Sequence, residues 1–148
     1  MNSRHRAREI ALQILYQYDL NALASGKVPP TDLALVADLR HHFDHFSVPE
    51  SLREFAAELV AGTLANLAKL DSELEKHASN WKVARMSSVD RSLLRMATFE
   101  MTRMGSVPET VVIDEAIELA KAFGTEDTPS FVNGVLDAIK VANLKTEA

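Results

Sequence analysis

Residues 52–67 read LREFAAELVAGTLANL, and the spacing of apolar side chains within them indicates the fold class. Apolar residues recur at intervals of three and four, which places them on one face of an α-helix. These residues are Leu52, Phe55, Ala56, Leu59, Val60, Thr63, Leu64 and Leu67. Because a continuous apolar face has to be covered by another element, the stretch predicts a long helix packed against its neighbours.

The same helical spacing continues through most of the chain. Residues 6–24 carry two apolar stripes and only a narrow polar strip, which predicts a central helix covered on two sides. The further segments with a helical pattern are residues 31–44, 70–77, 89–104, 109–123 and 128–139. No stretch is typical of a strand. The expected fold is therefore all-α, with about seven helices joined by short loops in a compact bundle.

Capping residues mark the ends of several predicted helices. Residues 47–50, Ser-Val-Pro-Glu, have the spacing of a capping box. Gly105 follows a predicted helix at the position that favours a left-handed residue. Thr128 is expected to cap the last helix, with Pro129 in its first turn. Residues 133–134, Asn-Gly, would indicate a hairpin between strands, but here they fall inside a helical pattern.

The composition excludes several classes of protein and site. The chain has 148 residues, of which 47% are hydrophobic and 25% are charged, as is typical of one soluble globular domain. It contains no cysteine, which excludes thiol nucleophiles, CxxC redox pairs and thiolate zinc sites. No apolar run is long and unbroken enough for a signal peptide or a membrane helix. We therefore expect a cytoplasmic protein that does not span a membrane.

Charge is distributed unevenly along the chain, whose formal net charge is -5. Residues 1–8, here called the leader, contain three Arg and no acid. Residues 81–105, here called the second basic segment, contain five Lys or Arg and two acids, and the rest of the chain is acidic. This pattern is typical of an anion site combined with an acidic face for a basic partner, although ordinary solvated helix faces would produce it as well.

The sequence contains no recognisable catalytic motif. There is no GxSxG, no phosphate-binding glycine loop and no HExxH. His41 and His45 are one helical turn apart, and Asp38 and His42 have the same spacing. Either pair could supply two metal ligands, which are too few for a site. We expect no catalysis, no metal and no cofactor.

The leader is the segment most suited to binding an anion. Arg4 and Arg8 are one helical turn apart and Arg6 lies between them, so their guanidinium groups would fan around the first turn of a helix that begins near Ser3. The free N–H groups at a helix N-terminus also attract phosphate. The leader therefore predicts an RNA or phosphate site, with three ordinary surface arginines as the alternative.

Several motifs in register resemble one known family. Arg4-His5-Arg6-Ala7-Arg8-Glu9 runs into Ala11-Leu12-Gln13-Ile14-Leu15-Tyr16. The motifs that follow are Asn80-Trp81, Val89-Asp90-Arg91, Leu94-Arg95-Met96-Ala97, Phe99-Glu100, Val107-Pro108, residues 113–121 (IDEAIELAK), Phe123-Gly124 and residues 131–137 (FVNGVLD). In this order they resemble the NusB family of bacterial transcription antitermination factors. The resemblance covers nearly the whole chain and is weakest over residues 24–50.

The resemblance implies an architecture and a function. It implies one domain over residues 1–148, with two small subdomains that form an N-terminal half of about residues 1–79 and a C-terminal half of about residues 80–148. Members of the family bind the single-stranded boxA element of nascent RNA together with ribosomal protein NusE. They do so in the complex that keeps RNA polymerase transcribing ribosomal RNA operons. The implied function is that of a non-catalytic, RNA-binding antitermination factor.

The resemblance also implies which residues contact RNA. The positions that carry over are Arg4, Arg6, Arg8, Asp127 and Phe131. Cations hold the backbone of single-stranded RNA and aromatic rings stack on its bases, so these residue types suit the ligand. His5 and Ser130 stand where relatives often have Arg and Lys. Both changes remove positive charge, which predicts weaker RNA binding or more reliance on the partner.

Tyr16 and Asp90 carry over as residues that face NusE, a ribosomal protein expected to be basic and therefore complementary to an acidic surface. Each position also has a structural alternative. Tyr16 and Phe131 suit a packed core, and Asp90 and Asp127 suit the first turn of a helix, where the dipole favours an acid. Trp81 suits either RNA stacking or a plug between subdomains.

Two other functions are compatible with the same residues. The first is the NusB-like RNA-binding module of a ribosomal RNA methyltransferase, which shares the helices but is fused to a catalytic domain. The second is a scaffold that binds only proteins, in which the leader is incidental. A homodimer is left open as well, because helices that are apolar on two sides can close on a second copy of the chain.

Overall fold

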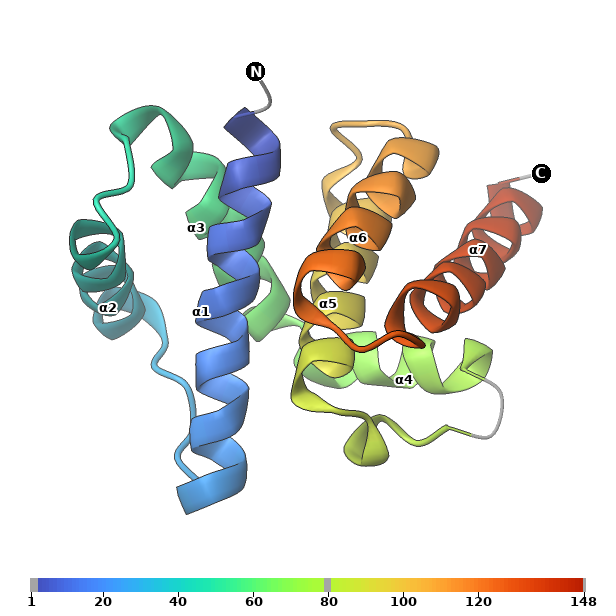
Figure 1. Cartoon of the computed structure of the whole chain (residues 1–148), viewed down its shortest axis with the longest axis horizontal. Helices are drawn as coiled ribbons and strands as arrows, with labels where there is room; N and C mark the ends of the chain where they lie inside the picture. The colour runs from blue at the N-terminus through green and yellow to red at the C-terminus, as the bar shows by residue number, and fades with distance from the viewer. Residues whose placement is uncertain (1–2, 79–80, 148) are drawn as a thin grey trace. The chain divides into compact units, whose positions relative to one another are not determined.

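The computed structural model describes residues 3–78 and 81–147, and these residues are helical nearly throughout (Figure 1). Seven α-helices are formed within them: α1 (Ser3–Ser25), α2 (Asp32–His45), α3 (Glu50–Ala65), α4 (Leu67–His77), α5 (Ser88–Phe99), α6 (Glu109–Phe123) and α7 (Thr128–Glu147). A short 3-10 helix, η1 (Val83–Arg85), precedes α5, and a π-helical turn, η2 (Glu100–Met104), follows it. None of the described residues forms a strand. The prediction of an all-α fold with about seven helices is confirmed.

The chain divides into two compact units, Met1–Ala65 and Asn66–Ala148. The resemblance to the NusB family implied a division near residue 79, after α4. The structure places it before α4, because Leu70 and Leu74 of that helix are fully buried and α4 packs against α5 and α7. The apolar side of a short helix therefore decides the boundary between the units.

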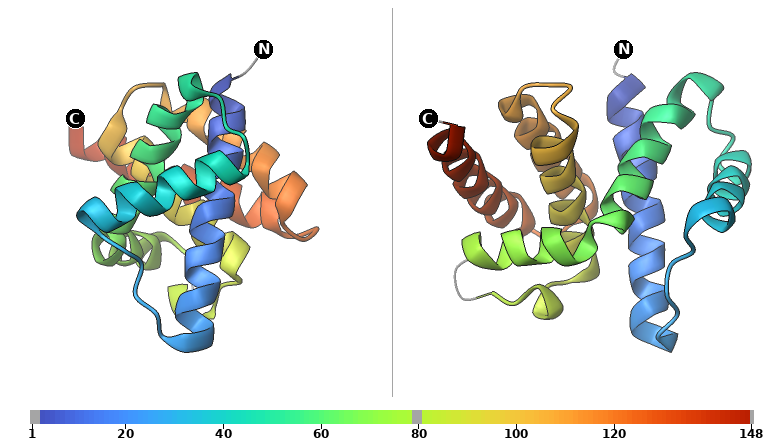
Figure 2. Two further views of the ribbon diagram at one scale, coloured as in Figure 1. Left: turned by 90° about the vertical axis from the view of Figure 1, so that its left-hand side faces the viewer. Right: turned by 180° about the vertical axis from the view of Figure 1, so that it is seen from behind.

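The first unit contains α1, α2 and α3, and α1 and α3 form its largest packing surface (Figure 2). The predicted inner stripe of α1 is buried: Ala7, Ile10, Ala11, Ile14, Leu15 and Tyr18. The second stripe is covered only in part. Leu12 is buried, whereas Leu20 and Leu23 near the end of the helix are exposed. The expectation that α1 is covered on two sides along its length is therefore wrong for its last turns.

The second unit is organised around α5, which packs against α4, α6 and α7. The buried residues of α5 are Arg91, Ser92, Leu93, Leu94, Met96, Ala97, Thr98 and Phe99. They occupy residues 91–94 and 96–99, with the half-buried Arg95 between them, so most of the surface of this helix is covered. Three of the buried residues, Arg91, Ser92 and Thr98, are polar. Burying a polar group is costly unless it is hydrogen-bonded, and Arg91 is bonded to two backbone carbonyls, whereas the hydroxyls of Ser92 and Thr98 have no hydrogen-bond partner among the described residues.

The helix ends follow the sequence signals only in part. Gly105 has a φ of +62° and ends η2 in the expected left-handed conformation. Residues 133–134 lie inside α7, as expected. The predicted capping box is not formed, because Ser47 has a φ of +52° and α3 begins only at Glu50. An N-cap residue needs an extended backbone, which Ser47 does not have.

Candidate nucleic-acid interface

Residues 3–8 of the leader form the start of α1. Arg4 and Arg6 are exposed, and the first turn of the helix contains no acidic residue. Nη1 of Arg6 lies 3.8 Å from Oε1 of Glu9, one turn further along. An exposed ion pair at this distance contributes little and is easily exchanged for another anion. The start of α1 therefore presents two guanidinium groups at the positive end of the helix dipole.

Arg8 differs from the other two arginines of the leader, because it is only 3% exposed. Its guanidinium carbon lies 5.2 Å from the centre of the Phe55 ring of α3, and that of Arg4 lies 4.7 Å from the same ring. Each distance is within the range of a cation–π interaction. The ring of Phe55 thus holds both side chains. Sequence spacing alone did not distinguish the buried arginine from the exposed ones.

The other predicted RNA contacts lie at the start of α7, in the second unit. Asp127 is exposed directly before the helix, and its carbonyl accepts a hydrogen bond from the N–H of Phe131 at 3.2 Å. The Phe131 ring is half-buried, and the core position beside it is taken by Val132, which is fully buried. Phe131 therefore keeps part of its ring accessible, and the alternative that it is a core residue applies only to the other part.

The Phe131 ring contacts Trp81 edge to face. The two ring centres are 5.7 Å apart and the planes are inclined by 61°. Trp81 is 54% exposed, which makes it the most accessible of the large aromatic side chains near α7. An edge-to-face pair at this distance is attractive, and here it leaves aromatic surface open to solvent.

Asp90 holds the start of α7 in place. Its Oδ1 accepts a hydrogen bond from the hydroxyl of Thr128 at 2.9 Å, and its N–H is capped by Oγ of Ser87 at 3.1 Å. Thr128 is buried, and its Oγ1 also accepts a bond from the N–H of Thr125 at 3.0 Å. Thr128 is the first residue of α7 and not its cap, which corrects the expectation from the sequence. Asp90 thus has a structural bond besides any partner it contacts.

Gly124 makes this arrangement possible. A Cβ atom at this position would lie 2.5 Å from the side chain of Thr128, which is closer than real Cβ atoms approach. The φ of Gly124 is -95°, so the requirement for glycine comes from the close approach and not from the backbone conformation. The Phe-Gly motif seen in the sequence therefore has a packing reason at the start of α7.

The predicted NusE contact at Tyr16 lies on the second apolar stripe of α1 and is half-buried. It is neither a fully packed core residue nor a free surface side chain. Asp90, the other predicted contact, is also half-buried. Both residues keep enough accessible surface to touch a partner, and their role toward one stays a prediction.

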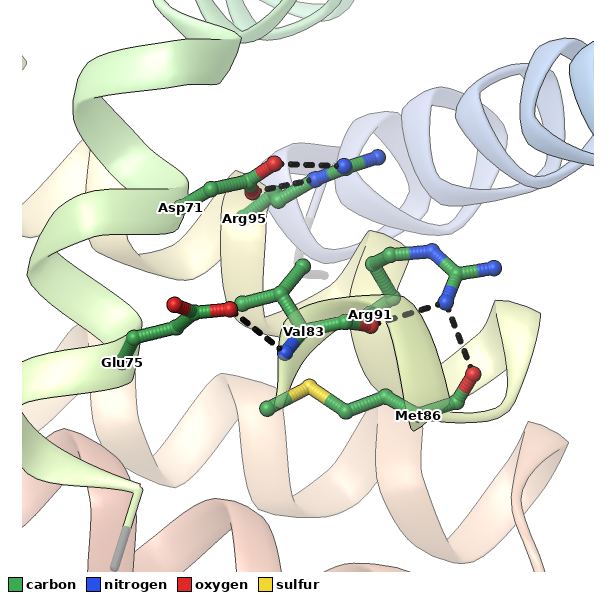
Figure 3. A network of polar contacts seen from close by, with 6 residues as sticks. All are labelled: Asp71, Glu75, Val83, Met86, Arg91 and Arg95. Atoms are coloured by element: carbon green, nitrogen blue, oxygen red, sulfur yellow. Dashed lines mark hydrogen bonds and ion pairs between the residues drawn. The ribbon is translucent and has the colours of Figure 1, made fainter. Parts of the chain in front are cut away.

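Both arginines of the second basic segment that lie on α5 are bonded within the protein (Figure 3). Arg91 is 3% exposed and donates from Nη1 to the carbonyls of Val83 and Met86, at 2.9 and 2.8 Å. Arg95 makes a two-pronged ion pair with Asp71 of α4, at 2.7 and 2.8 Å. Arg91 and Arg95 both belong to the basic segment whose charge indicated an anion site. Their partners lie 5 to 24 positions away, and no sequence pattern marks them.

The histidine cluster of α2 lines a groove of about 560 Å³ in the first unit. The Tyr18 hydroxyl donates a short hydrogen bond to Asp38, and Nε2 of His42 lies 3.5 Å from Oδ2 of the same carboxylate. Burial, followed by the contact with Asp38, raises the pKa of Tyr18. Among the described residues, no three His, Asp or Glu side chains converge on one point that could hold a metal ion. The described helices also include none that is long and apolar enough to cross a bilayer.

Comparison with known proteins places these features in a family. The NusB family model matches residues 5–140 of the chain. The transcription antitermination protein NusB of Desulforapulum autotrophicum is 43% identical over 141 residues, which cover 95% of this chain and 93% of that protein. The corresponding protein of Geotalea uraniireducens is 40% identical, with 94% of each chain covered. These relatives match over nearly their whole length.

Solved structures agree with the sequence relatives. The structure of NusB and NusE in complex with double-stranded RNA contains a chain that superimposes with a TM-score of 0.79 at 28% identity, covering 96% of this chain and 98% of that one. The structure of NusB from T. maritima gives a TM-score of 0.77 at 30% identity, covering 98% and 97%. The helices, the motifs at the starts of α1 and α7, and both kinds of comparison agree that this chain belongs to the NusB family.

Proposed function

We propose that this chain is a non-catalytic transcription antitermination factor that binds RNA together with ribosomal protein NusE. Two comparisons support this proposal. The curated relatives are named transcription antitermination proteins, and one solved relative is a complex of NusB, NusE and double-stranded RNA. We further propose that the RNA is the single-stranded boxA element of ribosomal RNA operons and that the protein acts with RNA polymerase in the cytoplasm.

The observation that carries this proposal is the first turn of α1, which presents exposed Arg4 and Arg6 without an acid. Guanidinium groups match the geometry of phosphate, and the helix N-terminus adds its own positive potential. A chain with a net charge of -5 gains nothing for RNA binding from its overall charge, so the contact has to be local. We assign the phosphate contacts to Arg4 and Arg6.

Arg8 has a different task in this proposal. Its side chain is buried over Phe55, where it shares the ring with Arg4. It therefore supports the position of Arg4 and does not meet the RNA backbone itself. Because the leader offers only two exposed arginines, the affinity for RNA depends on few cations and on NusE.

At the start of α7, Asp127 and Phe131 are proposed to contact bases. Asp127 is exposed and can accept from an exocyclic amino group, and Phe131 offers part of its ring for stacking. NusE is proposed to bind near Tyr16 and Asp90, both of which are half-buried. For Asp90, the bond to Thr128 means that a change there also disturbs the start of α7.

The test is a titration of labelled single-stranded boxA RNA, with and without NusE, followed by fluorescence anisotropy. We expect binding by the protein alone and tighter binding with NusE. A duplex RNA of equal length is the comparison ligand, and weaker binding of the duplex is expected. If NusE binds and neither RNA does, the protein is a scaffold for proteins and the proposal is wrong.

The contribution of the leader is measured by the salt dependence of the same titration. Each phosphate neutralised on a single strand adds a slope of about -0.7 to the plot of log affinity against log salt. Replacing Arg4 and Arg6 by Ala should flatten the slope by about one to two units. Arg40→Ala is the matched control, because it removes an exposed arginine from α2. Equal slopes for the double variant and the wild type would remove the leader from the interface.

A further inference from the structure

Trp81 is the single tryptophan of the chain, and it is 54% exposed. Large aromatic side chains are mostly buried because they bring much apolar area out of water. The exposed Trp81 side chain is not isolated. Its ring packs edge to face on that of Phe131, and the two ring centres are 5.7 Å apart. Two rings from different parts of the second unit thus share one accessible surface.

The backbone that follows Trp81 is held from two sides, through bonds at Val83 and Met86 (Figure 3). On one side, Oε2 of Glu75 in α4 accepts a hydrogen bond from the N–H of Val83 at 3.0 Å. On the other side, Nη1 of Arg91 in α5 donates to the carbonyls of Val83 and Met86, at 2.9 and 2.8 Å. The N–H of Trp81 itself donates to the carbonyl of Ala78 at 3.0 Å.

These bonds make the segment of residues 81–86 an anchored loop. Arg91 is buried, and its bonds to the two carbonyls are charge-assisted and therefore stronger than bonds between neutral groups. The N–H of Val83 would otherwise lack a partner inside a 3-10 turn. An exposed ring on an anchored backbone loses little conformational freedom when it binds a ligand.

The charges on this segment favour an anionic ligand. Lys82 and Arg85 are exposed, and residues 81–89 contain no acid. Cations beside exposed rings are the combination that binds single-stranded nucleic acid, because the cations meet the backbone and the rings meet the bases. An interface for another protein would use the same rings but would not require the cations.

We infer that Trp81 and Phe131 together form a stacking surface for an unpaired RNA base, and that Glu75 and Arg91 are positioning residues for this surface. The inference rests on the proposed function, to which it adds Trp81 as a contact and the loop of residues 81–86 as part of the interface. Phe131 alone offers only part of one ring, and Trp81 extends the surface on which a base can lie.

The single tryptophan provides a direct measurement. Single-stranded boxA RNA is titrated into the full chain while the Trp81 emission is recorded, and anisotropy of labelled RNA gives the affinity in parallel. Stacking on a base is expected to quench the emission in proportion to the bound fraction. A duplex of the same length is expected to leave the emission nearly unchanged, because its bases are already stacked. NusE alone is also expected to leave it unchanged.

Trp81→Ala is expected to weaken binding of the single strand about tenfold and to keep the salt slope, because no phosphate contact is lost. Trp81→Phe, which retains a ring, should recover part of the affinity. The melting temperature of both variants should stay close to that of the wild type, since the side chain is exposed.

The positioning role is tested at Glu75, which is exposed and makes its bond to Val83 from outside the core. Glu75→Ala removes the acceptor and should weaken RNA binding several-fold with an unchanged salt slope. Glu75→Gln keeps an oxygen acceptor and should restore binding. Glu73→Ala, on the same helix and with the same change in charge, is the matched control and should bind like the wild type.

The outcomes separate this inference from the function on which it rests. If the single strand binds with the salt slope expected of the leader, but the Trp81 emission and the affinity of Trp81→Ala do not change, the stacking surface is wrong and the function stands. If NusE alone changes the emission and RNA does not, the two rings face the protein partner and the inference is again wrong. If the wild-type protein binds no RNA, the proposed function itself is wrong, and the inference that rests on it is wrong as well.

Discussion

The leader and the second basic segment each carry an excess of three positive charges, yet the structure uses them differently. In the leader, Arg4 and Arg6 remain exposed at the start of α1. On α5, Arg91 is buried against two backbone carbonyls and Arg95 is paired with Asp71. The same excess of positive charge therefore gives two exposed arginines at the start of α1 and two internally bonded arginines on α5.

The difference shows that the charge of a segment does not measure its capacity to bind an anion. A guanidinium group has five N–H donors, and carbonyls or carboxylates of the same chain occupy them first where they lie within reach. Near α5, such acceptors are supplied by α4 and by residues 83–86. The first turn of α1 contains no acid, so its exposed arginines keep donors for an external ligand.

The strongest test of this comparison is Arg91→Ala. It leaves the carbonyls of Val83 and Met86 without their buried donor, and we expect it to lower the free energy of unfolding by about 3 kcal/mol, since bonds to charged groups and unsatisfied buried acceptors are each costly. Urea unfolding followed by circular dichroism measures the change. Arg103→Ala, an exposed arginine of the same segment, is the control and should change stability by less than about 0.5 kcal/mol. Similar losses in both variants would contradict the assignment of Arg91.

Arg8→Ala tests whether burial or position in the sequence decides the role of an arginine. Arg8 belongs to the leader but is buried over Phe55, so it should behave like Arg91. We expect a loss of about 2 kcal/mol, from the cation–π contact and the packing of the side-chain stem. Thermal unfolding with Arg6→Ala as the matched variant checks the difference. If Arg8→Ala is as stable as the wild type and its RNA binding depends less on salt, Arg8 contacts an RNA phosphate and the structural role is wrong.

The Arg95 and Asp71 pair is suited to a double-mutant cycle. Both side chains are partly exposed, and the two-pronged geometry makes the pair stronger than an ordinary surface ion pair. Replacing either residue by Ala should cost about 1.5 kcal/mol, and the double variant should cost little more than one single variant. The coupling is obtained from urea unfolding of the four proteins. Fully additive losses would mean that the two residues act independently.

The smallest effect on stability is expected for the combined change of Arg4 and Arg6 to Ala. Arg4 has an exposed contact with Phe55 and Arg6 has only a long ion pair with Glu9, so the expected loss is about 0.5 kcal/mol. The same variant is the one whose RNA binding should lose salt dependence. A loss of stability as large as that of Arg91→Ala would show that the leader is a structural element and not a binding surface.

Much of the fold followed from local patterns, because helix periodicity involves only residues three and four apart. The inner stripe of α1, the helix after residue 105 and the helical reading of residues 133–134 were all predicted in this way. The division between the two units could not be predicted from local patterns. It depends on which neighbours cover Leu70 and Leu74, and both neighbours follow α4 later in the chain.

The sequence predicted which residue types form the candidate site, but it did not predict which of their side chains are exposed. Arg4, Arg6 and Asp127 are exposed, as a binding role requires, whereas Arg8 is buried and Asp90 is bonded to Thr128. The contact between Trp81 and Phe131 joins residues 50 positions apart, and nothing in either local sequence marks it. Resemblance to the family singled out Phe131, and only the coordinates put Trp81 beside it.

The amino-acid sequence by itself determined that this chain is all-helical, which face of most helices turns inward and where positive charge is concentrated, because these properties depend on near neighbours along the chain. Only the tertiary structure decided which arginines keep their N–H donors available for a ligand and which form hydrogen bonds with the protein's own carbonyls and carboxylates. That choice depends on acceptors brought within about 3 Å by packing, and hydrogen bonds act only at such distances.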